Sequence, residues 1–164
     1  MNFDYNSITN NETVSYIGQF VLDATGETMN YINPHKKPNG KNDASIIKAM
    51  GDIVYYMFVN KELVKIGKAG GANGFIGRAR TYTPNNPKHN DSTNRMIIRK
   101  LIEMNEDTIE IYAISTPRTV TTYSCPISGD QIRIEAETHG AIETAHTHKA
   151  MNEGFELPFC TQKK

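Results

Sequence analysis

The side chains best suited to chemistry lie between residues 53 and 82. Tyr55 is in the β-branched and aromatic run 53–59, and Lys65 is in a second apolar run that starts after the polar residues 60–62. Two such runs around a short polar turn predict an antiparallel hairpin. We expect this hairpin to bring the Tyr55 phenol and the Lys65 amine close together.

A glycine-rich loop at 67–74 follows the hairpin and leads into a predicted short helix that carries Arg78. Tyrosine normally titrates near 10, so Tyr55 is a weak base at neutral pH unless the neighbouring cations Lys65 and Lys68 favour its phenolate. The guanidinium of Arg78 suits a phosphate because its donors form a rigid fork. The loop itself matches neither the P-loop nor the dinucleotide-binding glycine pattern, which argues against a nucleotide site.

These motifs resemble those of the GIY-YIG nuclease family. The resemblance rests on Ile53-Val54-Tyr55, Lys65-Ile66-Gly67, the Arg-x-x-x-Tyr spacing from Arg78 to Tyr82, and Glu137 within Glu135-Ala136-Glu137-Thr138. The lysine in place of the second tyrosine is typical of a subset that includes small type II restriction enzymes and phage endonucleases. Further matches to that subset are Ser92-Thr93, Tyr112-Ala113 and Cys160-Thr161-Gln162. The resemblance covers about residues 51–164.

The resemblance implies a DNA endonuclease that acts on double-stranded DNA with Mg²⁺, or with Mn²⁺ as a substitute. In this family Tyr55 would take a proton from water, Arg78 would bind the scissile phosphate, and Glu137 would hold the metal. Glu135 and Glu143 are rivals for the metal role, although both are expected to be solvated helix acids. A monomer with one such site cuts one strand at a time, so double-strand cleavage needs a homodimer or two binding events. The alternative function is a DNA-binding module without catalysis, because Lys65 replaces the usual tyrosine.

The charge distribution also favours a polyanionic partner. The formal net charge is zero, yet residues 61–100 hold nine Lys or Arg against two acids, a local charge of +7. A basic face on a neutral molecule can bind DNA, although a solvated helix face is the alternative interpretation. The candidate DNA-binding residues outside the catalytic group are Lys36, Lys37, Lys41, Arg80, Tyr82 and Lys88.

The expected fold class is α+β, with a small three-stranded, mainly antiparallel sheet flanked by helices. Residues 1–50 are expected to form an N-terminal helical extension or arm, with a helix from about 9 to 26, and residues 51–164 the nuclease domain. The third strand is predicted at 109–113, a loop or small hairpin at 115–131, and a helix carrying Glu137 from residue 131 onward.

Length and composition set further limits. The 164 residues suffice for one packed domain, and no apolar run is long enough to cross a membrane, so the default expectation is a cytoplasmic protein. The two cysteines are too few for a disulfide framework and are expected to be reduced. A zinc site built from His139, His146 and His148 is disfavoured, because zinc pairs on a helix normally lie four residues apart and no cysteine is near.

Overall fold

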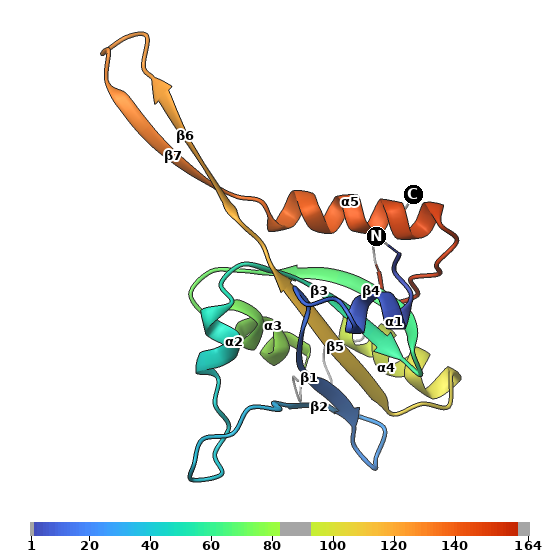
Figure 1. Ribbon diagram of the computed structural model, residues 1–164. Coiled ribbons are helices and arrows are strands. Elements are labelled where there is room, and N and C mark those ends of the chain that lie inside the picture. The colour runs from blue at the N-terminus through green and yellow to red at the C-terminus, as the bar shows by residue number, and fades with distance from the viewer. Residues whose placement is uncertain (1, 83–92, 161–164) are drawn as a thin grey trace.

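The computed structural model describes residues 2–82 and 93–160 of the chain. Its centre is a five-stranded antiparallel sheet with the order β2-β1-β5-β3-β4 (Figure 1). The strands are β1 (Ser15–Leu22), β2 (Met29–Ile32), β3 (Ile53–Val59), β4 (Glu62–Ala69) and β5 (Thr108–Ser115). The predicted hairpin is β3 and β4, and its turn is tight because Asn60 and Lys61 both adopt positive φ angles. The predicted α+β class is confirmed.

Helices cover both faces of this sheet (Figure 1). The helices α2 (Ser45–Ala49), α3 (Gly74–Tyr82) and α4 (Thr93–Glu103) pack on one face, and α1 (Tyr5–Thr9) and α5 (His139–Asn152) pack on the other. Because side chains alternate along a strand, β3 sends Tyr55 and Met57 to the α3 side and Tyr56 and Phe58 to the α5 side. All seven residues of β3 are buried, which is expected for a strand covered by helices on both faces.

The predicted N-terminal helix is wrong, because the middle of that segment forms β1. A β-bulge between Tyr16 and Gly18 inserts one residue, and Gly18 has a φ of 132° that suits glycine. Ile17 and Phe20 therefore both reach the core although they are three residues apart, a spacing that imitates a helix. β1 pairs with β5, so the expected three-stranded sheet gains two strands from residues 1–50.

A second sheet projects away from the body as a long hairpin (Figure 1). It consists of β6 (Arg118–Ser124) and β7 (Gln131–Glu137), and it fulfils the prediction of a loop or small hairpin after residue 115. The helix predicted from residue 131 is wrong in its first part. Residues 131–137 alternate polar and apolar side chains, which is the period of a strand, and α5 begins only at His139. Glu137 is therefore the last residue of a strand.

Two smaller expectations concern membranes and thiols. Among the described residues, no helix is long and apolar enough to cross a membrane. Cys125 and Cys160 are both free thiols.

Candidate active site

Tyr55 and Arg78 do come together, in a cluster with Tyr82 between β3 and α3. The Tyr55 hydroxyl lies 2.9 Å from the Tyr82 hydroxyl, and Arg78 Nε donates to it at 3.5 Å. The Arg78 guanidinium also lies over the Tyr82 ring, 5.1 Å from its centroid. Tyr55 packs against Gly67 of the Lys-Ile-Gly motif, where any β-carbon would clash with the phenol ring. The glycine of the motif is therefore a steric requirement of the tyrosine.

The surroundings of Tyr55 differ from those expected for an activated base. Its side chain is completely buried, and this burial raises the pKa of Tyr55 well above its ordinary value. The neighbouring Tyr82 adds to the increase in pKa, and Arg78 opposes it. Arg78 is exposed at the surface and donates to the buried hydroxyl, so its guanidinium lies between that hydroxyl and solvent.

Neither lysine expected beside the phenol is its partner. Lys65 lies on the same sheet face as Tyr55, but it is buried and its Nζ donates to the carbonyl oxygen of Phe159 at 2.8 Å. Lys68 pairs across the hairpin with Val54, so it lies on the opposite face, where its Nζ approaches Gly140 of α5. The role expected for these lysines in lowering the pKa of Tyr55 thus has no geometric basis, and Arg78 is the cation in contact.

Glu137 belongs to a second cluster at the base of the projecting hairpin. Asp52, Glu137 and His139 each offer one ligand atom, and these three atoms lie within 4.8 Å of one another. Asp52 directly precedes β3, Glu137 ends β7, and His139 begins α5, so the start of β3 meets the junction of β7 and α5, which is far from it in sequence. Gly70 makes this possible, because a β-carbon at that position would clash with Asp52 and lie 3.0 Å from His139.

Arg118 supplies the positive charge of this cluster. Its Nε donates to Asp52 Oδ2 at 2.9 Å, and its guanidinium lies 3.7 Å from Glu137 and 4.0 Å from Glu135. Burial acts to raise the pKa of Asp52, but hydrogen bonds from the Gly71 amide and Arg118 outweigh it, and the pKa ends below its ordinary value. Asp52 is therefore a carboxylate at neutral pH although its side chain is almost entirely buried.

The donor set fits a divalent cation. Carboxylate oxygens are ligands that Mg²⁺ and Mn²⁺ both accept, and an imidazole nitrogen is more typical of the transition metals. His139 Nδ1 is buried, has no hydrogen-bond partner among the described residues, and lies 3.7 Å from Glu137. An unpaired buried nitrogen beside two carboxylates is what a ligand position looks like before a cation is bound. Arg118 holds Asp52 more closely than Glu137, so Glu137 is the carboxylate more readily released to a cation.

Sequence reasoning missed Asp52 and Arg118 as members of this cluster. The only local signal for Asp52 was a carboxylate placed directly before a buried strand, and nothing local links it with residue 118. His139 was considered only with His146 and His148. The structure separates them, because His146 Nδ1 pairs with the Tyr56 hydroxyl at 2.9 Å on the α5 face of the sheet.

Glu143, expected to be a solvated helix acid, is instead buried, with 8% of its surface exposed. It lies on the side of α5 that faces the sheet, together with Thr147 and Ala150. The Cys160 thiol is close enough to Glu143 and to Lys65 for both to affect its pKa, which burial raises overall. Glu143 therefore stays a rival to Glu137 as the functional carboxylate, while Glu135 is half exposed at the hairpin base.

The candidate DNA-binding residues fall into separate groups. Lys36, Lys37 and Lys41 are exposed on a small loop closed by a bridge between Lys36 and Asn42. Arg80 is exposed on α3. Tyr82 is only 2% exposed and serves as the partner of Tyr55, so the structure does not present it to a ligand. Lys88 lies outside the described residues.

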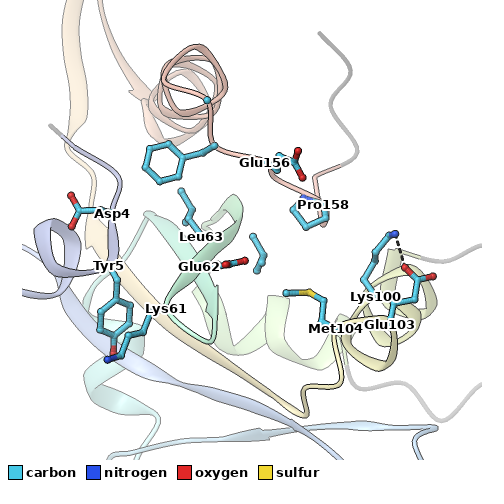
Figure 2. Close-up of a pocket in the computed structure, with 13 residues that line it drawn as sticks. Asp4, Tyr5, Lys61, Glu62, Leu63, Lys100, Glu103, Met104, Glu156 and Pro158 are labelled. Atoms are coloured by element: carbon cyan, nitrogen blue, oxygen red, sulfur yellow. Dashed lines mark hydrogen bonds and ion pairs between the residues drawn. The ribbon is translucent and has the colours of Figure 1, made fainter.

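One pocket of the described residues lies outside both clusters. It has a volume of about 590 Å³ and is lined by α1, the turn of the β3–β4 hairpin, the end of α4 and the segment after α5. Figure 2 shows Lys61, Lys100, Glu103 and Glu156 around it, and none of the candidate site residues is among its lining residues. An open surface site, as expected for a small sheet acting on a large ligand, agrees better with the two clusters.

Comparisons with known proteins identify solved structures with a similar fold but no similar sequence. No family model and no curated protein sequence matches the chain. Among solved structures, restriction endonuclease HPY188I in complex with product DNA matches with a TM-score of 0.53 and 17% identity, covering 99% of this chain and 88% of its own. A mutant of bacteriophage T4 EndoII matches with a TM-score of 0.55 and 18% identity, covering 89% of this chain and 94% of its own. The chain therefore shares its fold with restriction endonuclease HPY188I and with bacteriophage T4 EndoII.

Proposed function

We propose that the protein is a metal-dependent endonuclease that hydrolyses phosphodiester bonds of double-stranded DNA. The observation that carries the proposal is the convergence of Asp52, Glu137 and His139, with donor atoms within 4.8 Å, on a fold shared with two endonucleases. The Tyr55–Arg78 pair adds a proton acceptor for the attacking water and a cation for the phosphate. The GIY-YIG resemblance supports the same assignment, with restriction-type or phage-type cleavage of preferred sites.

Arg78 is the proposed phosphate ligand. It is exposed, it cannot lose its charge, and its position over Tyr82 fixes the direction of its fork of donors. A guanidinium in this place also stabilises the negative charge that develops on the phosphate oxygens in the transition state. The ionised fraction of Tyr55, a phenolate that Arg78 stabilises, then accepts a proton from the attacking water and becomes the neutral phenol.

Glu137 is the proposed metal ligand, assisted by Asp52 and His139. A bound Mg²⁺ or Mn²⁺ supplies a Lewis acid for the phosphate oxygens and for the leaving 3′ oxygen. The residues of the chain keep this site in order. Asp52 stays ionised because of the Gly71 amide and Arg118, and Gly70 leaves the space in which Asp52 and His139 meet.

DNA contacts are proposed at two exposed places of the described structure. The loop with Lys36, Lys37 and Lys41 carries three ammonium groups, and the projecting hairpin carries Arg133, whose side chain makes no ion pair with any residue of the described segments. The ammonium groups can contact phosphates, and a two-stranded ribbon has the width to enter a major groove. The hairpin is our candidate for sequence-specific contacts.

The competing function is a DNA-binding module without catalysis. It is favoured by the burial of Lys65 and by the complete burial of Tyr55, which leave few polar groups open to water on that face. It does not account for the ionised, mostly buried Asp52 beside an unpaired His139 nitrogen.

The first experiment is cleavage of supercoiled plasmid by the purified protein with Mg²⁺, Mn²⁺ or EDTA. We expect cleavage with either metal, none with EDTA, and a loss on the order of 100-fold or more in the Glu137→Ala variant, because a metal ligand contributes several kcal/mol to transition-state stabilisation. Glu135→Ala is the matched control, since Glu135 also lies by Arg118 but is outside the donor set.

Three results would change the assignment. Unchanged cleavage by Glu137→Ala with loss in Glu143→Gln would move the metal site to the buried carboxylate of α5. Equal losses of cleavage in Glu137→Ala and Glu135→Ala would show that both glutamates act only by holding Arg118. No cleavage by any form, with DNA binding that salt weakens, would establish the binding module.

A further inference from the structure

Arg118 divides its guanidinium between the body of the protein and the projecting hairpin. It is the first residue of β6, and its Nε donates to Asp52 Oδ2, directly before β3, at 2.9 Å. Its two terminal nitrogens face carboxylates of β7, with Nη1 4.0 Å from Glu135 and Nη2 3.7 Å from Glu137. The Nε side of the guanidinium is therefore hydrogen-bonded, whereas its other end makes ion-pair contacts that are longer than a hydrogen bond.

The three carboxylates around Arg118 differ in their access to water. The Asp52 side chain is only 2% exposed, so without Arg118 it would be a buried charge that lacks its charged partner. The Glu135 and Glu137 side chains are 50% and 51% exposed, so water can take the place of the arginine at either one. Breaking the bond to Asp52 therefore costs more free energy than breaking the contact with Glu137.

The contacts of this cluster leave negative charge in excess. Three carboxylates contact one guanidinium, which is a surplus of two negative charges. Asp52 and Glu137 also belong to the donor set with His139, and Glu135 does not. Glu135 thus stays available as a partner for the arginine when Glu137 turns to a cation.

We propose that Arg118 is the counter-cation of this cluster before a divalent cation binds, and that Glu137 exchanges Arg118 for the cation while Asp52 keeps it. This inference rests on the proposed metal role of Glu137. Arg118 is then a positioning residue, because it acts through Asp52 and Glu137. It holds the ionised Asp52 in place, and its competition for Glu137 lowers the affinity of the site for the cation.

The exchange predicts opposite effects of losing Arg118 in the two states of the protein. Without a divalent cation, the buried Asp52 lacks its charged partner, so the protein becomes less stable. With a divalent cation, Glu137 has no competing partner, so the cation binds more tightly and adds more stability than in the native protein. An arginine that only attached the hairpin to the body would lower the stability equally in both states.

Binding of Mn²⁺ to the full chain, measured by calorimetry without DNA, tests the exchange. Arg118→Gln should bind Mn²⁺ tighter than the native protein by on the order of fivefold, which is the effect of one ion pair at about 4 Å in water. Its melting temperature should be lower in EDTA by several degrees, and saturating Mn²⁺ should raise that temperature by more than in the native protein.

Lys68→Gln is the matched control for a general effect of charge. Lys68 is exposed and its Nζ approaches Gly140, next to His139, but it is not among the ion-pair partners of the three carboxylates within the described residues. Removing this charge should change the affinity for Mn²⁺ by less than about twofold, because water and salt screen an exposed charge.

The native protein provides a second test through the side-chain signals of ¹⁵N-labelled arginine. The Nε–H signal of Arg118 is assigned by its loss in Arg118→Lys. Saturating Mg²⁺ should leave this proton as slow to exchange with solvent as before, because its hydrogen bond to Asp52 remains. Faster exchange with Mg²⁺ would show that Asp52 gives up the arginine, and the proposal would be wrong.

The results separate this proposal from the proposed function. Unchanged or weaker Mn²⁺ binding by Arg118→Gln, or equal tightening in Lys68→Gln, overturns the exchange at Glu137. If Glu137→Ala has nevertheless lost Mn²⁺ binding, the metal role of Glu137 stands without the exchange. If Glu137→Ala binds Mn²⁺ as the native protein does, or if the native protein and Arg118→Gln both fail to bind it, the metal role of Glu137 is wrong and the exchange is wrong with it.

Discussion

At the scale of single residues, Tyr55 combines an expected partner with an unexpected environment. Arg78 contacts its hydroxyl as anticipated, but the phenol is buried under Tyr82 and Arg78, and the two lysines of the motif lie elsewhere. Burial stabilises the neutral phenol, because it penalises the charged form. A proton acceptor in this position works through a small phenolate fraction that Arg78 stabilises.

This environment predicts how the cleavage rate depends on pH. Because the pKa of Tyr55 is raised, the phenolate fraction grows about tenfold per pH unit throughout the range below that pKa. We expect the single-turnover rate with saturating metal to increase from pH 7 to pH 9 without reaching a plateau. The measurement is the rate of plasmid nicking over this range for the native protein and for Tyr55→Phe.

The two variants of the tyrosine pair provide the control. Tyr55→Phe should be slower by about two orders of magnitude at pH 8 and should lose most of the pH dependence. Tyr82→Phe also removes one hydroxyl from the pair but should retain the pH dependence, because the accepting group remains. A plateau near neutral pH in all three proteins would exclude Tyr55 as the proton acceptor.

At the scale of elements, glycines decide how closely β4 and α5 approach their neighbours. Gly67 lets the Tyr55 ring lie directly on β4, and Gly140 lies next to the flexible end of Lys68 at the start of α5. The two positions therefore respond differently to the same added methyl group. At position 67 the methyl group meets a buried aromatic ring, and at position 140 it meets an exposed amine that can move.

We predict opposite effects of alanine at these two positions. Gly67→Ala forces the buried Tyr55 ring out of place and should lower the free energy of unfolding by about 1–3 kcal/mol. Gly140→Ala requires only a shift of Lys68 and should raise the free energy of unfolding by up to about 1 kcal/mol, because alanine favours a helix more than glycine does. Urea denaturation of both variants measures the difference, and equal destabilisation would show that Gly140 also needs its close approach.

At the scale of the whole molecule, the net charge is zero, and several cations are buried or already paired with acids. Of the basic candidates, the three lysines of the loop at 36–41 are exposed, whereas Lys65 is buried. Two other surface lysines are already paired, Lys100 with Glu103 and Lys149 with Glu153. The number of cations that can meet phosphates is therefore smaller than the sequence count suggests.

This distribution predicts the salt dependence of DNA binding. Each phosphate contact contributes about 0.9 to the slope of log affinity against log salt concentration. Replacing Lys36, Lys37 and Lys41 by glutamine should reduce that slope by up to about 2.7, measured in EDTA on a duplex of fixed length. Lys100→Gln and Lys149→Gln together should change it little, because acids already neutralise both lysines. An unchanged slope in the triple variant would remove the loop from the DNA interface.

Local pattern in the sequence was enough for the hairpin of β3 and β4, the helix with Arg78, the strand β5 and the α+β class. Each of these follows from short-range periodicity and turn residues, and the encounter of Tyr55 with Arg78 follows from a hairpin and a helix that are neighbours in sequence. The pattern failed at β1, where a bulge at Gly18 makes a strand imitate helical spacing, and at β7, where the period of a strand was assigned to the following helix.

Only the tertiary structure decided which charged groups meet. Asp52, Arg118 and the neighbouring pair Glu137 and His139 come from three separate places in the chain, and no local rule links these places. The directions of Lys65 and Lys68 also depended on register, because one residue along a strand moves a side chain to the other face. The extent to which each side chain is buried could not be predicted from the sequence either. It is set by which helices cover a strand, and it determines the pKa of Tyr55 and the ionisation of Asp52.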